Sequence, residues 1–258
     1  MGKKTNILIA AAAVAAAMAA VNRSVYRRAE RRRPSGGKTY RWRYGNISYT
    51  VSGRGTPVLL VHSPVMGADR TEWRRKAESL SKSHRVYAID LLGYGMSDKP
   101  GITYSSYLYS SLLNDFVREV IREKTAAVGA NETASILLAA QALDRNAYSG
   151  LVLINPAGIG TPSKQYPLLR NILNMPFLGT AFYSLLCSKM GVWLFYKKVC
   201  GIRDKDITDE MVDARHLSAH MGGVNGRLPV IAHLAGYFDV DSEGLLKKAT
   251  VPVKIVKR

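Results

Sequence analysis

The chain has 258 residues, an apolar content of 47% and a formal net charge of +18. This length and apolar content predict one large α/β domain or two small domains, and they exclude an intrinsically disordered chain. The basic surplus is concentrated at the start, because residues 1–43 carry eleven Lys and Arg against one acid, Glu30. No basic patch interleaved with aromatic residues is found, so we expect no nucleic-acid partner.

The first expected element is a transmembrane anchor over residues 1–22. Thr5 to Val21 is an apolar, Ala-rich segment of 17 residues without a charge, near the lower limit for a helix that spans a bilayer. An arginine cluster follows at once, and positively charged flanks are retained in the cytoplasm. We therefore expect a single-pass protein of the cell membrane with a cytoplasmic body, which contacts the membrane through this helix and its basic flank.

Two other interpretations of this segment remain open. Lys3 and Lys4 followed by the apolar run and Ala17-Met18-Ala19 also fit a cleaved signal peptide, in which case the protein would be exported. An Ala-rich arm that only lies on the membrane surface is the third possibility.

Residues 23–38 are predicted to form a basic linker, because RRRPSGGK at 31–38 combines charge with Pro and Gly. After it, TYRWRYG and NISYTVSG, joined at Gly45, alternate as two antiparallel strands do. Five apolar runs then predict buried parallel strands, most of them separated by helical stretches: 57–62, 85–90, 125–130, 150–155 and 251–256. The expected fold is α/β, a mostly parallel sheet with helices on both faces.

Three sequence blocks carry a resemblance to a known family. They are PVLLVHSPVMG at 57–67, RVYAIDLLGYGMSDKP at 85–100 and TAAVGANETASILLAAQAL at 125–143. Their spacing resembles the α/β-hydrolase family, and the middle block resembles its haloalkane dehalogenase and epoxide hydrolase branch. In such proteins a GxSxG turn between strand and helix holds a serine, or an aspartate, as nucleophile. Here the turn is GANET, and Asn131 stands at the nucleophile position; its amide is not a useful nucleophile.

The resemblance also implies where the oxyanion would be held. His62 and Ser63 stand where family members carry His-Gly, so the Ser63 backbone N–H would be one oxyanion donor and the Glu132 N–H the other. A carboxylate at Glu132 would oppose a developing oxyanion unless it points away. We expect His62 to be a buried turn histidine bonded to backbone rather than a catalytic group.

The resemblance assigns residues 39–158 to the hydrolase core, 159–246 to a helical cap and 247–258 to the last core strand. Within the predicted cap, a helix is expected from Thr208 to Met221, and His216 and His220 share one face of it. No third ligand accompanies these two histidines, so we expect cap packing, no metal site and no cofactor. The late acid and histidine of the family do not appear before Arg258; natural loss and truncation both remain open.

Two functions are therefore weighed. The favoured one is a catalytically silent or weakly active protein that binds a small apolar ligand or a partner under its cap. The alternative is an active hydrolase of a small ester, epoxide or haloalkane-like substrate, with a non-standard triad or one completed outside this chain. The fold supports either function, because function depends on the site rather than on the scaffold.

Overall fold

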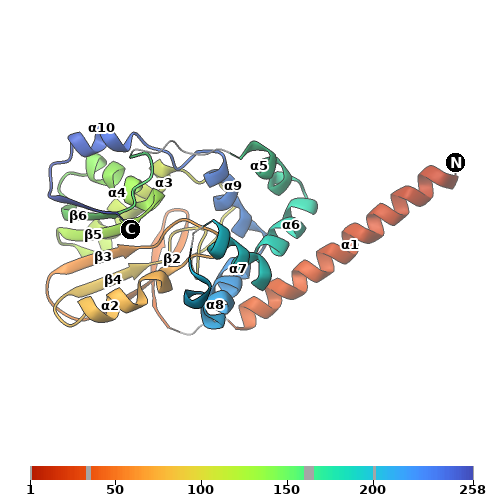
Figure 1. Ribbon diagram of the computed structural model, residues 1–258, viewed down its shortest axis with the longest axis horizontal. Helices are drawn as coiled ribbons and strands as arrows, with labels where there is room; N and C mark the ends of the chain where they lie inside the picture. The colour runs from red at the N-terminus through yellow and green to blue at the C-terminus, as the bar shows by residue number, and fades with distance from the viewer. Residues whose placement is uncertain (1, 33–35, 160–165, 200–201, 258) are drawn as a thin grey trace.

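A computed structural model describes residues 2–32, 36–159, 166–199 and 202–257. Its strands form one seven-stranded sheet of order β1-β2-β4-β3-β5-β6-β7 (Figure 1). The strand bounds are β1 Lys38–Trp42, β2 Gly45–Ser52, β3 Pro57–Val61, β4 Arg85–Ile89, β5 Thr125–Ala130, β6 Tyr148–Ile154 and β7 Val253–Val256. β2 pairs antiparallel with β1 and β4, and the remaining pairs are parallel. The strands predicted from the apolar runs are thus present, with the hairpin at one edge.

The sheet is covered on both faces. Within β3, Leu59 and Val61 contact one apolar cluster, whereas Val58 and Leu60 contact another on the opposite face. The first cluster includes α3 and α4, and the second includes Trp73 at the start of α2. The helices are α1 Gly2–Arg31, α2 Arg74–Leu80, α3 Ser106–Phe116, α4 Glu132–Leu143, α5 Pro167–Asn174, α6 Leu178–Leu186, α7 Lys189–Lys198, α8 Asp209–His220, α9 Leu228–Leu234 and α10 Ser242–Lys247. Because successive side chains of a strand point to opposite faces, two covered faces require the continuous apolar runs seen in the sequence.

Helices α5 to α9 form a cap beside the sheet, between it and α1 (Figure 1). Their apolar core contains Leu173, Tyr183 and Cys187, and Met66 of the loop after β3 packs into it. Helix α8 begins at the predicted place, where the Thr208 side chain accepts a hydrogen bond from Met211 N. The predicted cap extends too far, however, because α10 packs against α4. Its leucines contact the core cluster of the sheet, so α10 is part of the hydrolase core.

Helix α1 does not end at residue 22, after which the predicted linker begins. It continues to Arg31, and Asn22, Tyr26 and Ala29 are buried along one face of it. This face packs against α6 and α8, with the rings of Tyr26 and His220 5.7 Å apart. The i, i+4, i+7 spacing places the three buried residues on one side of the helix, so the cap covers that side while the arginines on the other side stay exposed. Residues 33–35 of the predicted linker lie outside the described residues.

Among the described residues, no single helix has both the length and the hydropathy of a membrane span. The consecutive helices α6 and α7 meet both criteria only as a pair, and they are bent by 66°.

Candidate active site at the turn between β5 and α4

The turn between β5 and α4 has a strained backbone at Asn131. This residue has φ 54° and ψ −128°, a conformation that residues with a side chain rarely adopt. Its N–H donates to Ile154 O at 2.9 Å and its C=O accepts from Ala157 N at 3.3 Å. A Cβ at Gly129 would lie 2.8 Å from Leu137 Cδ1 and 3.2 Å from Ala134 N, so glycine lets strand and helix approach closely here. The chain therefore builds a nucleophile elbow with an amide side chain on it.

Ser63 lies beside the elbow, as the sequence predicts, but its donors are already engaged. Its N–H donates to Glu72 Oε2 at 3.0 Å and its hydroxyl donates to Glu72 Oε1 at 3.0 Å. Asn131 Nδ2 in turn donates to Ser63 Oγ at 3.1 Å. The expectation that the Ser63 N–H serves as an open oxyanion donor is therefore wrong for this conformation. The carboxylate of Glu72 accepts the two hydrogen bonds that Ser63 could otherwise donate to a bound anion.

His62 is buried and bonded to backbone groups, as expected from the sequence. The ring is fully buried; Nε2 accepts a hydrogen bond from Leu91 N at 3.1 Å, and Nδ1 lies 2.8 Å from Ser63 O. Because Leu91 N–H can donate only to an unprotonated nitrogen, the proton is on Nδ1, which donates to the Ser63 carbonyl. Burial also lowers the pKa of His62, which favours this neutral form. Thr133 Oγ1 donates to His62 O at 2.8 Å and ties the elbow helix to the same loop.

Glu132 points toward the cap and pairs with a histidine. Its Oε1 lies 3.3 Å from His233 Nε2, and His233 Nδ1 lies 3.4 Å from Pro64 O. Burial lowers the pKa of His233, but the hydrogen bond and charge of Glu132 outweigh burial and raise it overall. Burial likewise raises the pKa of Glu132, and the hydrogen bond to His233 outweighs that effect and lowers it. The two groups thus form an ion pair beside the elbow.

The other cap histidines do not reach the elbow. His216 Nδ1 lies 2.7 Å from Cys187 O, and His220 Nδ1 lies 2.8 Å from His216 O. Burial also lowers the pKa of His220 to about 4. Both rings therefore pack within the cap, as the sequence predicts, and the ring of His220 also lies beside that of Tyr26 in α1.

Sequence reasoning missed Glu72 and the part played by His233. Glu72 is one of several acids close to α2 in the sequence. Its contact with Ser63 depends on the path of the loop between β3 and α2. His233 is one of three histidines in the predicted cap, and only the packing of α9 selects it. The nearest available signal was chemical: a buried carboxylate such as Glu132 requires a cationic or hydrogen-bonding partner.

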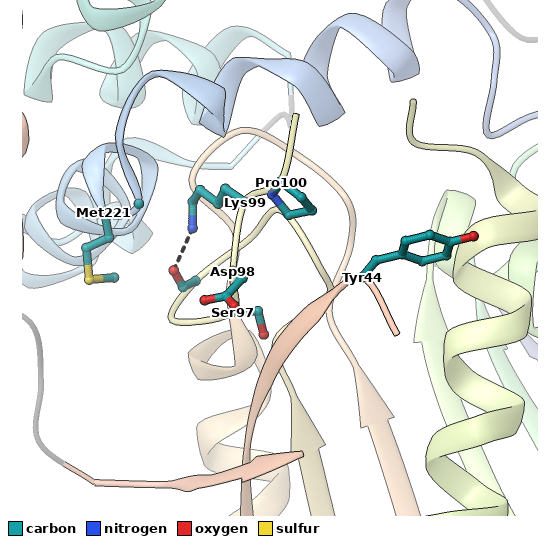
Figure 2. A pocket seen from close by; sticks show the side chains of 8 residues that line it. Tyr44, Ser97, Asp98, Lys99, Pro100 and Met221 are labelled. Atoms are coloured by element: carbon teal, nitrogen blue, oxygen red, sulfur yellow. Dashed lines mark hydrogen bonds between the residues drawn. The ribbon is translucent and has the colours of Figure 1, made fainter. Parts of the chain in front are cut away.

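A separate hollow of about 340 Å³ lies away from the elbow (Figure 2). It is lined by Tyr44, by residues 95 and 97–100 of the loop after β4, and by Met221 and Gly222 at the end of α8. Within it, Lys99 Nζ donates to Gly95 O at 2.8 Å. Neither Ser63 nor Asn131 lines this hollow, so binding of a small apolar ligand under the cap stays a prediction.

No family model matches the chain. Over 131 residues it is 31% identical to the 2-hydroxy-6-oxo-6-(2'-aminophenyl)hexa-2,4-dienoic acid hydrolase of Metapseudomonas resinovorans, covering 50% of this chain and 44% of that protein. The chain therefore spans less than half the length of this curated relative.

Solved structures are similar over more of the chain. An α/β-hydrolase fold protein from Burkholderia ambifaria has a TM-score of 0.67 and 24% identity, covering 85% of this chain and 79% of its own. The epoxide hydrolase CorEH has a TM-score of 0.69 and 18% identity, covering 86% and 81%. Together with the sheet order and the elbow, these likenesses identify the chain as an α/β-hydrolase fold protein.

Proposed function

We propose that this chain is a membrane-tethered α/β-hydrolase fold protein that binds a small apolar molecule or a partner at the elbow under its cap, without covalent catalysis. The observation that carries the proposal is the side chain at the elbow. Asn131 occupies the strained position that presents a nucleophile in this fold, and its amide is bonded to Ser63 instead of to a base. An amide donates and accepts hydrogen bonds, so it can orient a carbonyl or hydroxyl group without attacking it.

The surroundings of Asn131 support the same proposal. Catalysis of acyl transfer needs donors aimed at the place where negative charge develops. Here the Ser63 N–H is bonded to the carboxylate of Glu72, and the Glu132 carboxylate adjoins the second expected donor. The Glu72 carboxylate opposes an oxyanion beside Ser63 and disfavours hydrolysis through a tetrahedral intermediate, whereas the charge of Glu132 is offset by His233.

A fluorophosphonate probe tests this proposal on the full chain, because such a probe labels a serine that a base activates. We expect no labelling of the wild-type chain and none of Asn131→Ser, since both ring nitrogens of His233 face acceptors, Glu132 and Pro64 O. A serine hydrolase of this fold serves as the positive control. Stoichiometric labelling of one serine in the wild-type chain would overturn the proposal that the chain binds without covalent catalysis.

The alternative is an active hydrolase, and one observation favours it: a curated relative is named as a hydrolase. Its substrates would be small esters, epoxides or haloalkane-like compounds, or a dienoic acid of the kind for which the relative is named. The Glu132–His233 pair would then supply the acid and base functions. Release of product from such substrates by the wild-type chain, lost in His233→Gln, would support this alternative over the silent function.

The membrane tether is the second part of the proposal. The uncharged segment from Thr5 to Val21 and the arginines after it support a single span with the body in the cytoplasm. A reporter that is active only outside the cytoplasm, fused after Arg258, should stay inactive. An active reporter, or a mature chain that begins near Val21, would mean export.

A further inference from the structure

The cap exposes an unusual number of large apolar side chains. Among the described residues, nine of the sixteen exposed large hydrophobic side chains lie within 166–199, the region of α5 to α7. They are Tyr166, Leu168, Met175, Phe177, Leu178, Leu185, Met190, Leu194 and Val199. Single exposed apolar residues are ordinary, but such a concentration on one part of a protein marks a surface that contacts something apolar.

Helix α6 shows how this surface is built. Tyr183 and Cys187 face the cap core, whereas Leu178 and Leu185, seven residues apart, are 57% and 66% exposed on another side. The connection from α5 to α6 continues the exposed side with Met175 and Phe177. Helix α6 is thus apolar on both its buried and its outward face, the pattern of an element that has a second apolar environment.

Helix α1 runs past this part of the cap. It contacts α6 and α8. Its N-terminal part extends away from the body on the side where α5 and α6 lie (Figure 1). Asn22, which is buried against the cap, directly follows Val21, the last residue of the uncharged segment. At about 1.5 Å of rise per residue, the docked turns from Asn22 to Ala29 span only on the order of 10 Å. A membrane that received residues 5–21 would therefore lie against the cap, with no linker between them.

The charge of α1 specifies which apolar environment fits. Arg23, Arg27 and Arg31 recur every four residues, on the side of the helix opposite the buried face, and all three are exposed. With Ala20, Ser24 and Arg28 they line a hollow of about 470 Å³ that is open to solvent on the surface of α1. A basic surface on α1, on a chain whose cap also exposes apolar side chains, matches an anionic bilayer, where phosphate groups lie next to acyl chains.

We propose that the outward face of α5 to α7, together with the arginine row of α1, is a membrane-binding surface that seats the cap in the headgroup layer of an anionic bilayer. The inference rests on the proposed tether and goes beyond it, because it assigns the cap itself to the membrane surface. Interfacial helices bury apolar side chains at the boundary of the acyl chains and keep basic ones among the headgroups.

Photo-crosslinking on the full chain in anionic phospholipid vesicles tests this surface. The photoreactive residue p-benzoylphenylalanine replaces Leu178 in one variant, Leu185 in a second and Leu143 in a third. Leu143 is the matched control, because it is 55% exposed at the far end of α4, which leads away from the elbow. We expect mass spectrometry to find lipid adducts in the variants with the photoreactive residue at position 178 or 185. We expect none in the variant with it at position 143. We also expect fewer adducts in zwitterionic vesicles, where the arginines lack anionic partners.

Vesicle flotation of the same samples separates the two proposals. If the chain floats with the vesicles but Leu178 and Leu185 give no more lipid adduct than Leu143, the tether stands and the cap surface is refuted. If the chain does not float, the tether fails and the cap surface fails with it. Crosslinks from Leu178 or Leu185 to a second copy of the chain, in place of lipid, would overturn the proposal in favour of a dimer interface.

Discussion

The carboxylate of Glu72 accepts two hydrogen bonds from Ser63, one from its backbone N–H and one from its hydroxyl, each 3.0 Å long. Ser63 is almost fully buried, with 4% of its surface exposed. The pairing therefore satisfies two donors that water cannot easily reach, and it does so at the place where a hydrolase of this fold would hold an oxyanion. We therefore expect Glu72 to stabilise the folded chain; under the proposed function its carboxylate occupies the donors that an oxyanion would otherwise use.

Replacing Glu72 with alanine should destabilise the folded chain. Both Ser63 donors would lose their acceptor, and a buried donor without a partner costs about 1–3 kcal/mol. We expect Glu72→Ala to lower the free energy of unfolding by about that amount in urea denaturation. Glu78→Ala on the exposed side of α2 is the matched control and should change it little. Equal effects of the two substitutions would mean that the Ser63 pairing contributes no stability.

The strain at Asn131 predicts an unusual order of stability for substitutions there. Asn131→Gly and Asn131→Ala both remove the hydrogen bond to Ser63, but only alanine keeps a side chain at positive φ. Strain of this kind costs about 1–3 kcal/mol, which exceeds the roughly 0.5–1 kcal/mol of backbone entropy that glycine loses. Urea denaturation should therefore show the glycine variant to be more stable than the alanine variant by about 1 kcal/mol. An alanine variant that is equally or more stable would show that the turn relaxes.

The sequence predicted the scaffold because local patterns specify it. Apolar runs place the strands of the sheet, and the small residues around Gly129 allow the sharp turn to α4. Patterns of this kind do not identify contacts between distant segments. The pairing of Glu132 with His233 joins residues about one hundred positions apart, and the cap helix that carries His233 has no sequence feature that points to the elbow.

The predicted linker after residue 22 shows a second limit of local patterns. Charge density and the Pro and Gly residues of 31–38 favoured an irregular segment. The structure instead buries Asn22, Tyr26 and Ala29 on the cap, because three compatible residues at helical spacing suffice to dock a helix that is basic elsewhere. Tertiary contact, which the sequence does not display, decides in favour of the helix.

Removing the Tyr26 ring should release this docked part of α1. The side chain is 7% exposed and contacts the ring of His220, so Tyr26→Ala removes a large share of the buried face. We expect faster amide hydrogen exchange over residues 22–31, about tenfold for each 1.4 kcal/mol of docking energy lost, with the sheet unaffected. Arg27→Ala, on the exposed side, is the control and should leave exchange unchanged. If Tyr26→Ala exchanges like the control, the docking does not depend on that face.

The ion pair between Glu132 and His233 predicts a pH-dependent contribution to stability. The raised pKa of His233 stabilises the folded chain below the unfolded histidine value of about 6.5, and this contribution is lost as the pH rises through the higher folded value. The lowered pKa of Glu132 stabilises the folded chain above the unfolded value of about 4.3, and this is lost as the pH falls through the lower folded value. Both contributions are present together between these two unfolded values.

Glu132→Gln should therefore be most destabilising near pH 5.5 and least destabilising near pH 9. As the pH rises, His233 loses its proton, and the glutamine then replaces a carboxylate that has no cationic partner. Urea denaturation of the wild-type and variant chains across this range measures the difference. Glu210→Gln is a suitable control, because that side chain is 77% exposed in its ion pair with Arg74 and should change stability little at either pH. A cost of Glu132→Gln that is the same at both pH values would mean that the pair is not ionised in the folded chain.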